Sequence, residues 1–389
     1  MKICFVTQQY KNIKSGVGVY ANNYISYAVN NHHEITALVP DKENHPDHIK
    51  SVKFVKIKQS RFDPTPNKWL SFSCNALKYY QKNSHLFDLI HFSDAKEAFF
   101  LKKNINHSIG NVNDCYAAVA SLNPLHFKMN YPFDWLKRYF YYLIAKSLER
   151  KALKKLNIII ANSNYVKSQL IKKFHLDIDN ILVIHKSIHL NQLKKADLKI
   201  NNQSNIVFIG SNFQRKGLLK VIEASKKLVL DFPDIIIHVI GNDPILNQVK
   251  RYINHLSLKK HYIFYGNLSQ PQVIKILKKS KILLVPSLVE ALGLVYLEAM
   301  ANGVIAIGSK NGGTKEIIQD GYNGFLVDPF NTSEITDKVS KLLLNDKFRQ
   351  QIVLNGYKTI SSMKFDDTSM FIKTFNVYQK MISGELTNL

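Results

Sequence analysis

Short apolar runs alternate with helical patterns along almost the whole chain, and this alternation restricts the possible folds more than any other feature. Strands that alternate with helices of about 10–15 residues favour right-handed crossovers and parallel sheets with helices on both faces. The alternation occurs in two series, which flank a polar stretch rich in Asn and Lys at 177–204. The sequence therefore predicts an α/β protein with two Rossmann-like, doubly wound parallel-sheet domains facing a cleft.

The chain has 389 residues, enough for two or three domains at a typical size of about 100–200 residues each. We place an N-terminal domain at 1–195, a C-terminal domain at 196–365 and a final helix at 366–389. Helices alone are expected over 333–382. The other predicted strands are 3–7, 35–39, 52–57, 89–92, 158–161, 206–209, 235–240, 262–265, 282–285, 304–307 and 324–327, and the other predicted helices are 18–31, 68–82, 137–155, 217–230, 246–256, 271–279 and 294–302.

The charge and the cysteines narrow the class of protein. Lys and Arg exceed Asp and Glu by 53 to 29, a net charge of +24, which favours contact with polyanions such as nucleic acid, an anionic membrane or phosphorylated substrates. Cys4, Cys74 and Cys115 form no C-x-x-C pair, as is typical of a reducing compartment, and this argues against a zinc site. The apolar start is too short for a signal peptide, so we expect no export.

The longest stretch of low polarity, 282–308, carries two carboxylates, Glu290 and Glu298. Carboxylates are costly in lipid, so we interpret it as strand, loop, helix and strand of a soluble core. Gly293 permits a close backbone approach, and a helix is predicted to begin near Leu294. The free N–H groups of such a helix favour a phosphate, and the two carboxylates suit the hydroxyls of a ribose and of a sugar. The alternative is that both are ordinary exposed glutamates.

Arg215 and Lys216 lie in the segment 209–217, which directly follows a predicted strand and opens a helix. A guanidinium and an ammonium beside free backbone amides can hold a diphosphate and stabilise charge that develops on it. The alternative is that Arg215 and Lys216 are two ordinary cations on a solvated turn, which are common in a chain this basic.

A glycine loop with Gly16 and Gly18 follows the first predicted strand. It matches the dinucleotide fingerprint G-x-G-x-x-A only in part, because eight residues separate it from the strand and no acidic residue closes the next strand. We interpret it as a flexible loop near the cleft, with a purely structural turn as the alternative.

Aromatic and basic residues interleave over 127–155. This composition suits the headgroup region of an anionic membrane, and it could also stack on single-stranded nucleic acid. An ordinary domain helix with aromatic residues in the core and lysines in water is the third interpretation.

The pattern E-A-L-G-L-V-Y-L-E over 290–298, the Arg215-Lys216-Gly217 turn and Gly312-Gly313 together resemble glycosyltransferase family 4. The resemblance covers nearly the whole chain, and the segment 210–217 is most similar to the heptosyl glucosyltransferase of lipopolysaccharide core assembly. The chain departs from the family pattern at Ser211, at Asn113 in place of a histidine, and at 185–189.

The resemblance implies a retaining enzyme of GT-B fold that needs no metal and no cofactor, with a nucleotide-diphosphate sugar as donor substrate. Glu298 would bind the ribose, Glu290 the donor sugar, and Arg215 with Lys216 the diphosphate, together with the amides at Gly293 and Leu294. Gly16 and Gly18 would line the donor and acceptor site of the acceptor-side N-terminal domain. The last helix would cross back to that domain.

We therefore expect a cytoplasmic glycosyltransferase, peripheral on the inner face of the cell membrane. It would transfer a hexose from a UDP-sugar, rather than a GDP-sugar, to a lipid-linked or cell-surface glycan such as lipopolysaccharide, with no nucleic acid as partner. Two alternatives stay open: a GT-B nucleotide-sugar epimerase, and a catalytically inactive basic binding module of this fold.

Overall fold

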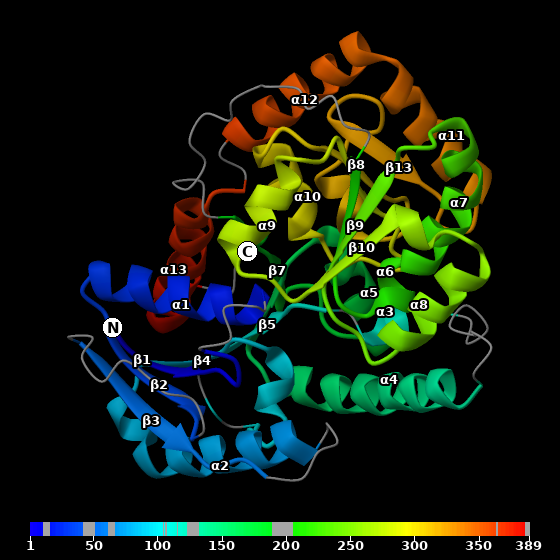
Figure 1. The fold of residues 1–389 in the computed structure, drawn as a ribbon. Coiled ribbons are helices and arrows are strands. Elements are labelled where there is room, and N and C mark those ends of the chain that lie inside the picture. The colour runs from blue at the N-terminus through cyan, green and yellow to red at the C-terminus, as the bar shows by residue number, and fades with distance from the viewer. Residues whose placement is uncertain are drawn as a thin grey trace. The chain divides into compact units, whose positions relative to one another are not determined.

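The structure, a computed structural model, describes residues 1–10, 16–41, 51–60, 67–103, 105, 107–114, 116–122, 132–188, 205–362 and 365–385. The described residues divide into two compact units (Figure 1). One holds those up to His185 together with those from Asp367 onward, and the other runs from Lys186 to Asp366. The boundary predicted at 195/196 lies outside the described residues, as do Cys115 and the start of the aromatic and basic segment.

The first unit is built on a seven-stranded sheet in which every pairing is parallel, in the order β3-β2-β1-β4-β5-β6-β7. Its central strands are buried along almost their full length, as in sheets covered on both faces. The strands are β1 (Lys2–Val6), β2 (Glu34–Pro40), β3 (Val52–Ile57), β4 (Leu89–Phe92), β5 (Ser108–Val112), β6 (Ile158–Ala161) and β7 (Ile181–Val183), and the helices are α1 (Gly16–Asn30), α2 (Asn67–Asn83), α3 (Tyr116–Val119), α4 (Pro132–Leu153), α5 (Asn164–Phe174) and α13 (Asp367–Ser383).

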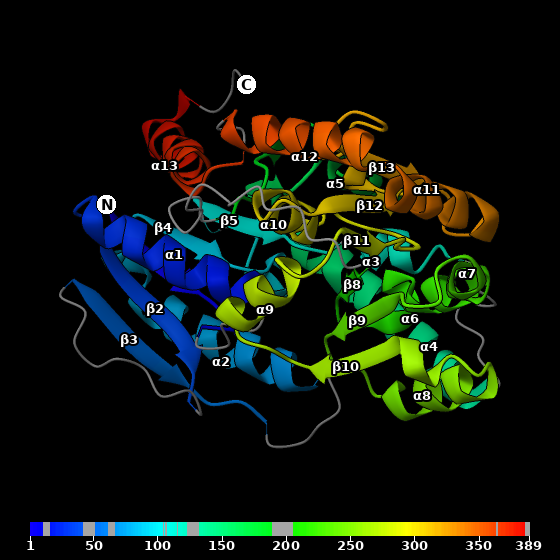
Figure 2. The same ribbon diagram turned by 45° about the horizontal axis from the view of Figure 1, so that its top comes forward.

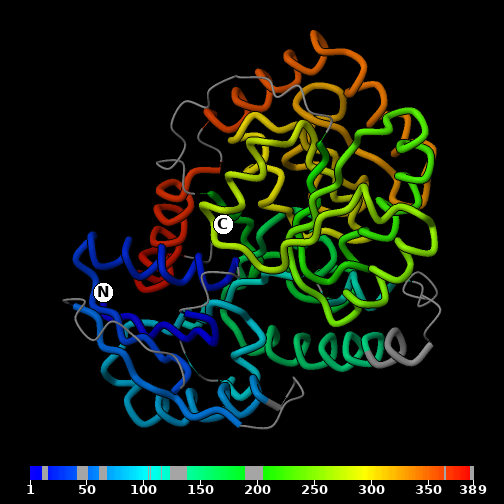
Figure 3. Tube along the Cα trace, in the orientation of Figure 1, coloured from blue at the N-terminus to red at the C-terminus, as the bar shows by residue number. Residues whose placement is uncertain are grey.

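The last helix of the chain, α13, belongs to the first unit and lies beside α1, as the red and blue segments of Figure 3 show. Phe371, Phe375 and Tyr378 of α13 enter the same hydrophobic core as Tyr24 of α1. The Tyr378 hydroxyl contacts His91 of β4 and donates to the Tyr24 hydroxyl at 3.0 Å. Burial lowers the pKa of His91 to about 3, so its ring stays neutral inside this aromatic core.

The second unit has a six-stranded parallel sheet in the order β10-β9-β8-β11-β12-β13, and helices cover it (Figure 2). The strand order reverses between β8 and β11, which is where open α/β sheets bind ligands beyond the carboxyl ends of their strands. The strands are β8 (Asn205–Ile209), β9 (Ile236–Ile240), β10 (Tyr262–Gly266), β11 (Ile282–Val285), β12 (Ile305–Ser309) and β13 (Gly324–Val327), and the helices are α6 (Phe213–Lys216), α7 (Leu218–Asp231), α8 (Leu246–His255), α9 (Gln270–Leu277), α10 (Leu294–Ala301), α11 (Thr332–Leu344) and α12 (Asp346–Ser361).

The predicted fold class is confirmed, since both units are doubly wound α/β units with parallel sheets. In the part of the chain that the structure describes, no helix is both long and apolar enough to span a bilayer.

Candidate functional site

Three loops meet at the strand reversal of the second unit. They follow β8, β11 and β12, and each passes unusually close to the next. A Cβ on Gly217 would lie 2.1 Å from the Pro286 carbonyl oxygen, and a Cβ on Gly312 would lie 2.1 Å from that of Glu290. Both glycines have a positive φ, +83° and +121°, which side-chain-bearing residues rarely adopt. The backbone of Gly217 therefore packs directly against one end of the segment from Pro286 to Glu290, and the backbone of Gly312 packs against the other end.

Backbone hydrogen bonds fix the same segment. The Leu288 amide donates to the Arg215 carbonyl at 2.7 Å, and the Gly313 amide donates to the Glu290 carbonyl at 2.9 Å. These bonds tie the loop after β11 to the turn after β8 on one side and to the loop after β12 on the other. Glu290 consequently has a defined backbone position at the carboxyl edge of the sheet.

Lys216 and Glu290 form the central ion pair of this site. Lys216 Nζ lies 2.6 Å from Glu290 Oε2, and the two side chains are 14% and 5% exposed. The Ser287 hydroxyl donates to the same carboxylate oxygen at 3.0 Å. Because both charges are largely shielded from water, the pair is weakly screened by salt. The structure thus joins two predicted residues and adds Ser287, which the sequence analysis did not single out.

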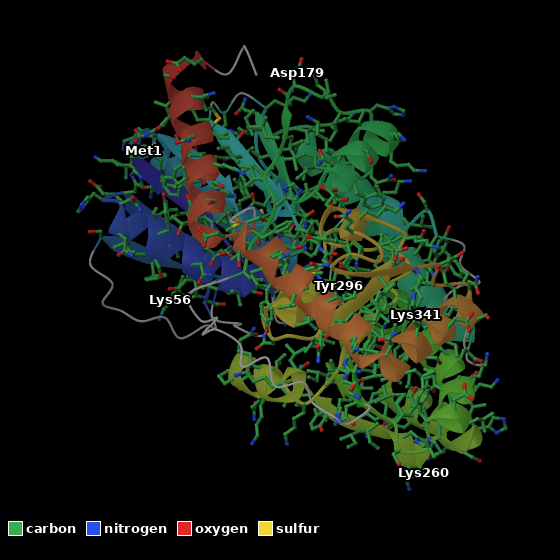
Figure 4. All side chains as sticks on the ribbon, turned by 90° about the horizontal axis from the view of Figure 1, so that it is seen from above. Met1, Lys56, Asp179, Lys260, Tyr296 and Lys341 are labelled. Atoms are coloured by element: carbon green, nitrogen blue, oxygen red, sulfur yellow. The ribbon has the colours of Figure 1, made fainter. Side chains whose placement is uncertain are left out.

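Helix α10 begins at the predicted place. Gly293 is its N-cap with φ +92°, and Leu294 is its first residue. A Cβ on Gly293 would lie 2.3 Å from the ring of Tyr296, the fully buried α10 residue labelled in Figure 4. The Tyr296 hydroxyl donates to the Val285 carbonyl at 2.8 Å, which anchors the start of α10 to the end of β11. The first turn of α10 therefore lies beside the loop that carries Glu290.

Glu298 lies on α10, eight residues after Glu290, and the residue is half-buried. Burial raises its pKa, while a hydrogen bond from the Gln270 amide at 3.3 Å acts in the opposite direction. Gln270 opens α9, and nothing in the sequence pattern indicated its contact with Glu298. A carboxylate here can accept hydrogen bonds from a pair of hydroxyls, as a ribose would offer.

The remaining predicted residues have different surroundings. Arg215 is a buried residue of the short helix α6, next to Lys216. Gly16 and Gly18 belong to the first unit, where Gly16 is the first residue of α1. Asn113, at the position of the family histidine, donates to the Ser93 carbonyl at 2.9 Å. Its own Oδ1 is buried and accepts no hydrogen bond from the described residues.

Glu97 is a buried acid of the first unit that the sequence analysis did not identify. It is 1% exposed, and its Oε1 accepts a hydrogen bond from the backbone N–H of Gln8 at 2.8 Å. Burial and the charge of Asp94 raise its pKa well above the usual value, against the opposing effects of Lys96 and the Gln8 amide. The carboxyl group therefore keeps its proton in the folded protein at a pH at which it ionises in the unfolded chain.

Glu97→Gln is expected to stabilise the protein increasingly as pH rises. A raised folded-state pKa contributes stability at low pH that is lost as pH rises, by up to about 1.4 kcal/mol per pH unit for one proton. The amide keeps the neutral form at every pH, so the gain in Tm over the unsubstituted protein should grow from pH 5 to pH 9. Thermal unfolding across this range tests it, with the exposed Glu34→Gln as control. A constant difference in Tm would contradict the expectation.

Comparisons with known proteins concern the family and the fold of this chain. Residues 191–359 match the model for glycosyl transferases group 1, and residues 14–192 match the model for glycosyltransferase family 4. The chain is 27% identical over 256 residues to the UDP-Gal:alpha-D-GlcNAc-diphosphoundecaprenol alpha-1,3-galactosyltransferase of Escherichia coli, covering 61% of this chain and 65% of that protein. Against other curated relatives, the matched part spans 39–59% of the relative's length.

Solved structures share the fold over the full length. WaaG, a glycosyltransferase involved in lipopolysaccharide biosynthesis, superposes with a TM-score of 0.74 and 16% identity, covering 97% of this chain and 99% of that one. Anabaena HepE in complex with UDP and glucose gives a TM-score of 0.73 and 18% identity, covering 98% and 100%. At these identities the likeness shows the fold, which is the predicted GT-B fold.

Proposed function

We propose, from the matches of 191–359 to glycosyl transferases group 1 and of 14–192 to glycosyltransferase family 4, that this chain is a retaining, metal-independent hexosyltransferase. The observation that carries the proposal is the Lys216–Glu290 pair at the strand reversal of the second unit, beside the start of α10. A cation, a carboxylate and a helix N-terminus at this edge supply what a nucleotide-diphosphate sugar requires.

In the proposed reaction, the bond between the anomeric carbon and the β-phosphate oxygen breaks, and a bond to the acceptor hydroxyl oxygen forms on the same face. The acceptor's proton passes to the leaving phosphate. Negative charge grows on the diphosphate as the bond breaks, and Arg215, Lys216 and the amides at Gly293 and Leu294 stabilise it more than they stabilise the bound donor. Glu290 would bind the sugar hydroxyls and Glu298 the ribose. No carboxylate nucleophile and no cofactor are needed.

The donor is proposed to be a UDP-sugar rather than a GDP-sugar, and the acceptor a lipid-linked or envelope glycan of the lipopolysaccharide type. Two similar proteins support this choice: the Escherichia coli relative is named for UDP-Gal and a diphosphoundecaprenol acceptor, and WaaG for lipopolysaccharide biosynthesis. HepE was solved with UDP and glucose. In this proposal the first unit, with Gly16 and Gly18, serves the acceptor side.

A ligand panel tests the proposed function. Thermal unfolding is measured with UDP, GDP, several UDP- and GDP-sugars, and a single-stranded oligonucleotide. A ligand that binds only the folded state raises the free energy of unfolding and therefore Tm. At a ligand concentration of 100 times Kd, the gain in free energy is about 2.7 kcal/mol. We expect stabilisation by UDP compounds, and product analysis with the stabilising sugar should show transfer. Stabilisation by the oligonucleotide alone would instead support a basic binding module, and conversion of the nucleotide sugar without an acceptor would support an epimerase.

The proposed location is cytoplasmic and peripheral, and the observation that supports its peripheral part is α4. Phe140, Leu143 and Ile144 are 54%, 37% and 50% exposed, and their spacing places them on one face of the helix. The exposed cations Arg150 and Lys151 follow in its last turn. An exposed apolar face with adjacent basic residues favours the interface of an anionic bilayer.

Replacing Phe140, Leu143 and Ile144 together by Ser is expected to abolish binding to phosphatidylcholine vesicles that contain phosphatidylglycerol, because it removes the inserting surface. Sedimentation at low and high salt measures the bound fraction of the protein. Ile178→Ser is the matched control, since Ile178 is an equally exposed apolar residue of the same unit, outside α4. Equal binding of the triple variant and the control would exclude α4 as the membrane contact.

A further inference from the structure

The ammonium of Lys216 is already matched by a negative charge of the protein. Its partner oxygen, Glu290 Oε2, is 2.6 Å away and also accepts the Ser287 hydroxyl at 3.0 Å. The Gly313 amide and the close approach of Gly312 hold the Glu290 backbone in place. A phosphate that approaches Lys216 must therefore share its cation with a fixed carboxylate.

The donor and the product of the proposed reaction differ in what they offer to that carboxylate. In a nucleotide sugar, the β-phosphate is bonded both to the α-phosphate and to the sugar, so it carries a single negative charge, and the sugar brings hydroxyl donors. In the nucleoside diphosphate left after transfer, the hydroxyls are gone and the terminal phosphate, bonded only to the α-phosphate, has a charge of about −1.5 to −2 at pH 7. Glu290 thus faces hydrogen-bond donors before the reaction and a larger negative charge after it.

We propose that Glu290 discriminates against the nucleoside diphosphate product and thereby speeds its release from the second unit. The carboxylate cancels part of the attraction that Lys216 exerts on the terminal phosphate, while it still binds the hydroxyls of the intact donor. With only 5% of the Glu290 side chain exposed, this repulsion is transmitted through a medium that screens charge poorly. The inference rests on the proposed function and assigns to Glu290 a role in product release at the same site.

The experiment replaces Glu290 by Gln, which has the same shape but no charge, and measures Kd for UDP and for UDP-glucose by calorimetry. GDP and GDP-mannose are used if the wild type binds those instead. Removing the carboxylate leaves Lys216 uncompensated, so the nucleoside diphosphate should bind about tenfold tighter. The nucleotide sugar should bind no tighter than before, because its hydroxyls exchange a charged carboxylate acceptor for the weaker acceptor oxygen of an amide. The ratio of the two Kd values therefore shifts at least tenfold toward the product.

Two matched variants separate charge at the site from other effects. Ser287→Ala removes a hydrogen bond to Glu290 but keeps the carboxylate, so the Kd ratio should stay near that of the wild type. Asp337→Asn removes one acidic charge from an exposed position 4.0 Å from Lys227, and any shift that it causes measures the effect of net charge alone. Glu290→Asp, which withdraws the carboxylate by one methylene, should change the ratio in the same direction but less, and serves if the Gln variant does not fold.

The inference is rejected if neither Glu290 variant binds the nucleoside diphosphate more tightly than the wild type does. It is also rejected if Asp337→Asn reproduces the shift. In both cases transfer by the wild type would still stand, so the proposed function would survive. A wild-type protein that binds neither nucleoside diphosphates nor nucleotide sugars would instead refute the proposed function, and the inference with it.

Discussion

Replacing Lys216 by Ala is expected to reduce the rate of sugar transfer by about 10²–10³-fold, the usual cost of removing one group that stabilises developing charge. Two effects act in the same direction. The ammonium is lost from the diphosphate as its charge grows, and Glu290, 5% exposed, is left as an unpaired carboxylate that repels the same phosphate. The loss should appear in kcat, because the interaction strengthens in the transition state.

Steady-state kinetics and a thermal unfolding curve for each variant test this expectation. Lys338→Ala is the control, because Lys338 also forms an ion pair, with Asp320 at 2.9 Å, but on α11 of the same unit. It should lose some stability and keep its turnover. Lys216→Arg should recover part of the rate, since the positive charge remains. Normal turnover in a folded Lys216→Ala protein would remove the proposed diphosphate clamp.

Gly312→Ala is expected to destabilise the second unit by about 3 kcal/mol or more, close to the upper range for a single substitution. The new methyl group would stand 2.1 Å from the Glu290 carbonyl oxygen and 2.9 Å from its amide nitrogen, so backbone must move on at least one side. The positive φ of +121° adds strain. In a unit of this size, Tm should fall by about 6–12 °C.

Gly321→Ala isolates the steric part of this cost. Gly321 also has a positive φ, +76°, but no atom of the residues that the structure describes lies within 4 Å of its hypothetical Cβ. It should therefore lose only the strain of the left-handed conformation, about 1–2 kcal/mol. Calorimetric unfolding of both variants gives the difference, and equal losses would show that the contact with Glu290 can relax. Affinity for the nucleotide sugar should fall only in Gly312→Ala, because only that substitution displaces the Glu290 backbone.

The strands of the second unit could be predicted closely because they are continuous apolar runs. The predicted strands at 282–285 and 324–327 coincide with β11 and β13, as expected where both faces of a strand are covered. Strand β5 was missed in the first unit. Its sequence, S-I-G-N-V, is polar and contains a glycine, yet all five residues are buried. The glycine in this strand is required by its close packing, because a Cβ on Gly110 would lie 2.6 Å from the side chain of Leu156. That contact is remote in sequence, so the local pattern does not reveal it.

The positions of the candidate site residues could be predicted where a motif marks them. Glu290, Gly293 and Lys216 lie at the strand ends and helix starts at which the sequence analysis placed them. Ser287 and Gln270 were not predicted, because their roles depend on side-chain contacts with Glu290 and Glu298 that spacing does not encode. The pairing of Lys216 with Glu290 was also missed, since 74 residues separate them and the sequence analysis assigned them to different parts of the donor.

The packing of α13 on α1 makes the first unit discontinuous along the chain. A fragment ending at His185 would expose the aromatic core around Tyr24 and leave His91 without the Tyr378 hydroxyl. An isolated version of this unit would have to be encoded as a permuted gene, with 367–385 joined through a linker to one end of 1–185. A protease that cuts before Asp367 would therefore remove a helix that forms part of the hydrophobic core of the first unit, and not a peripheral extension.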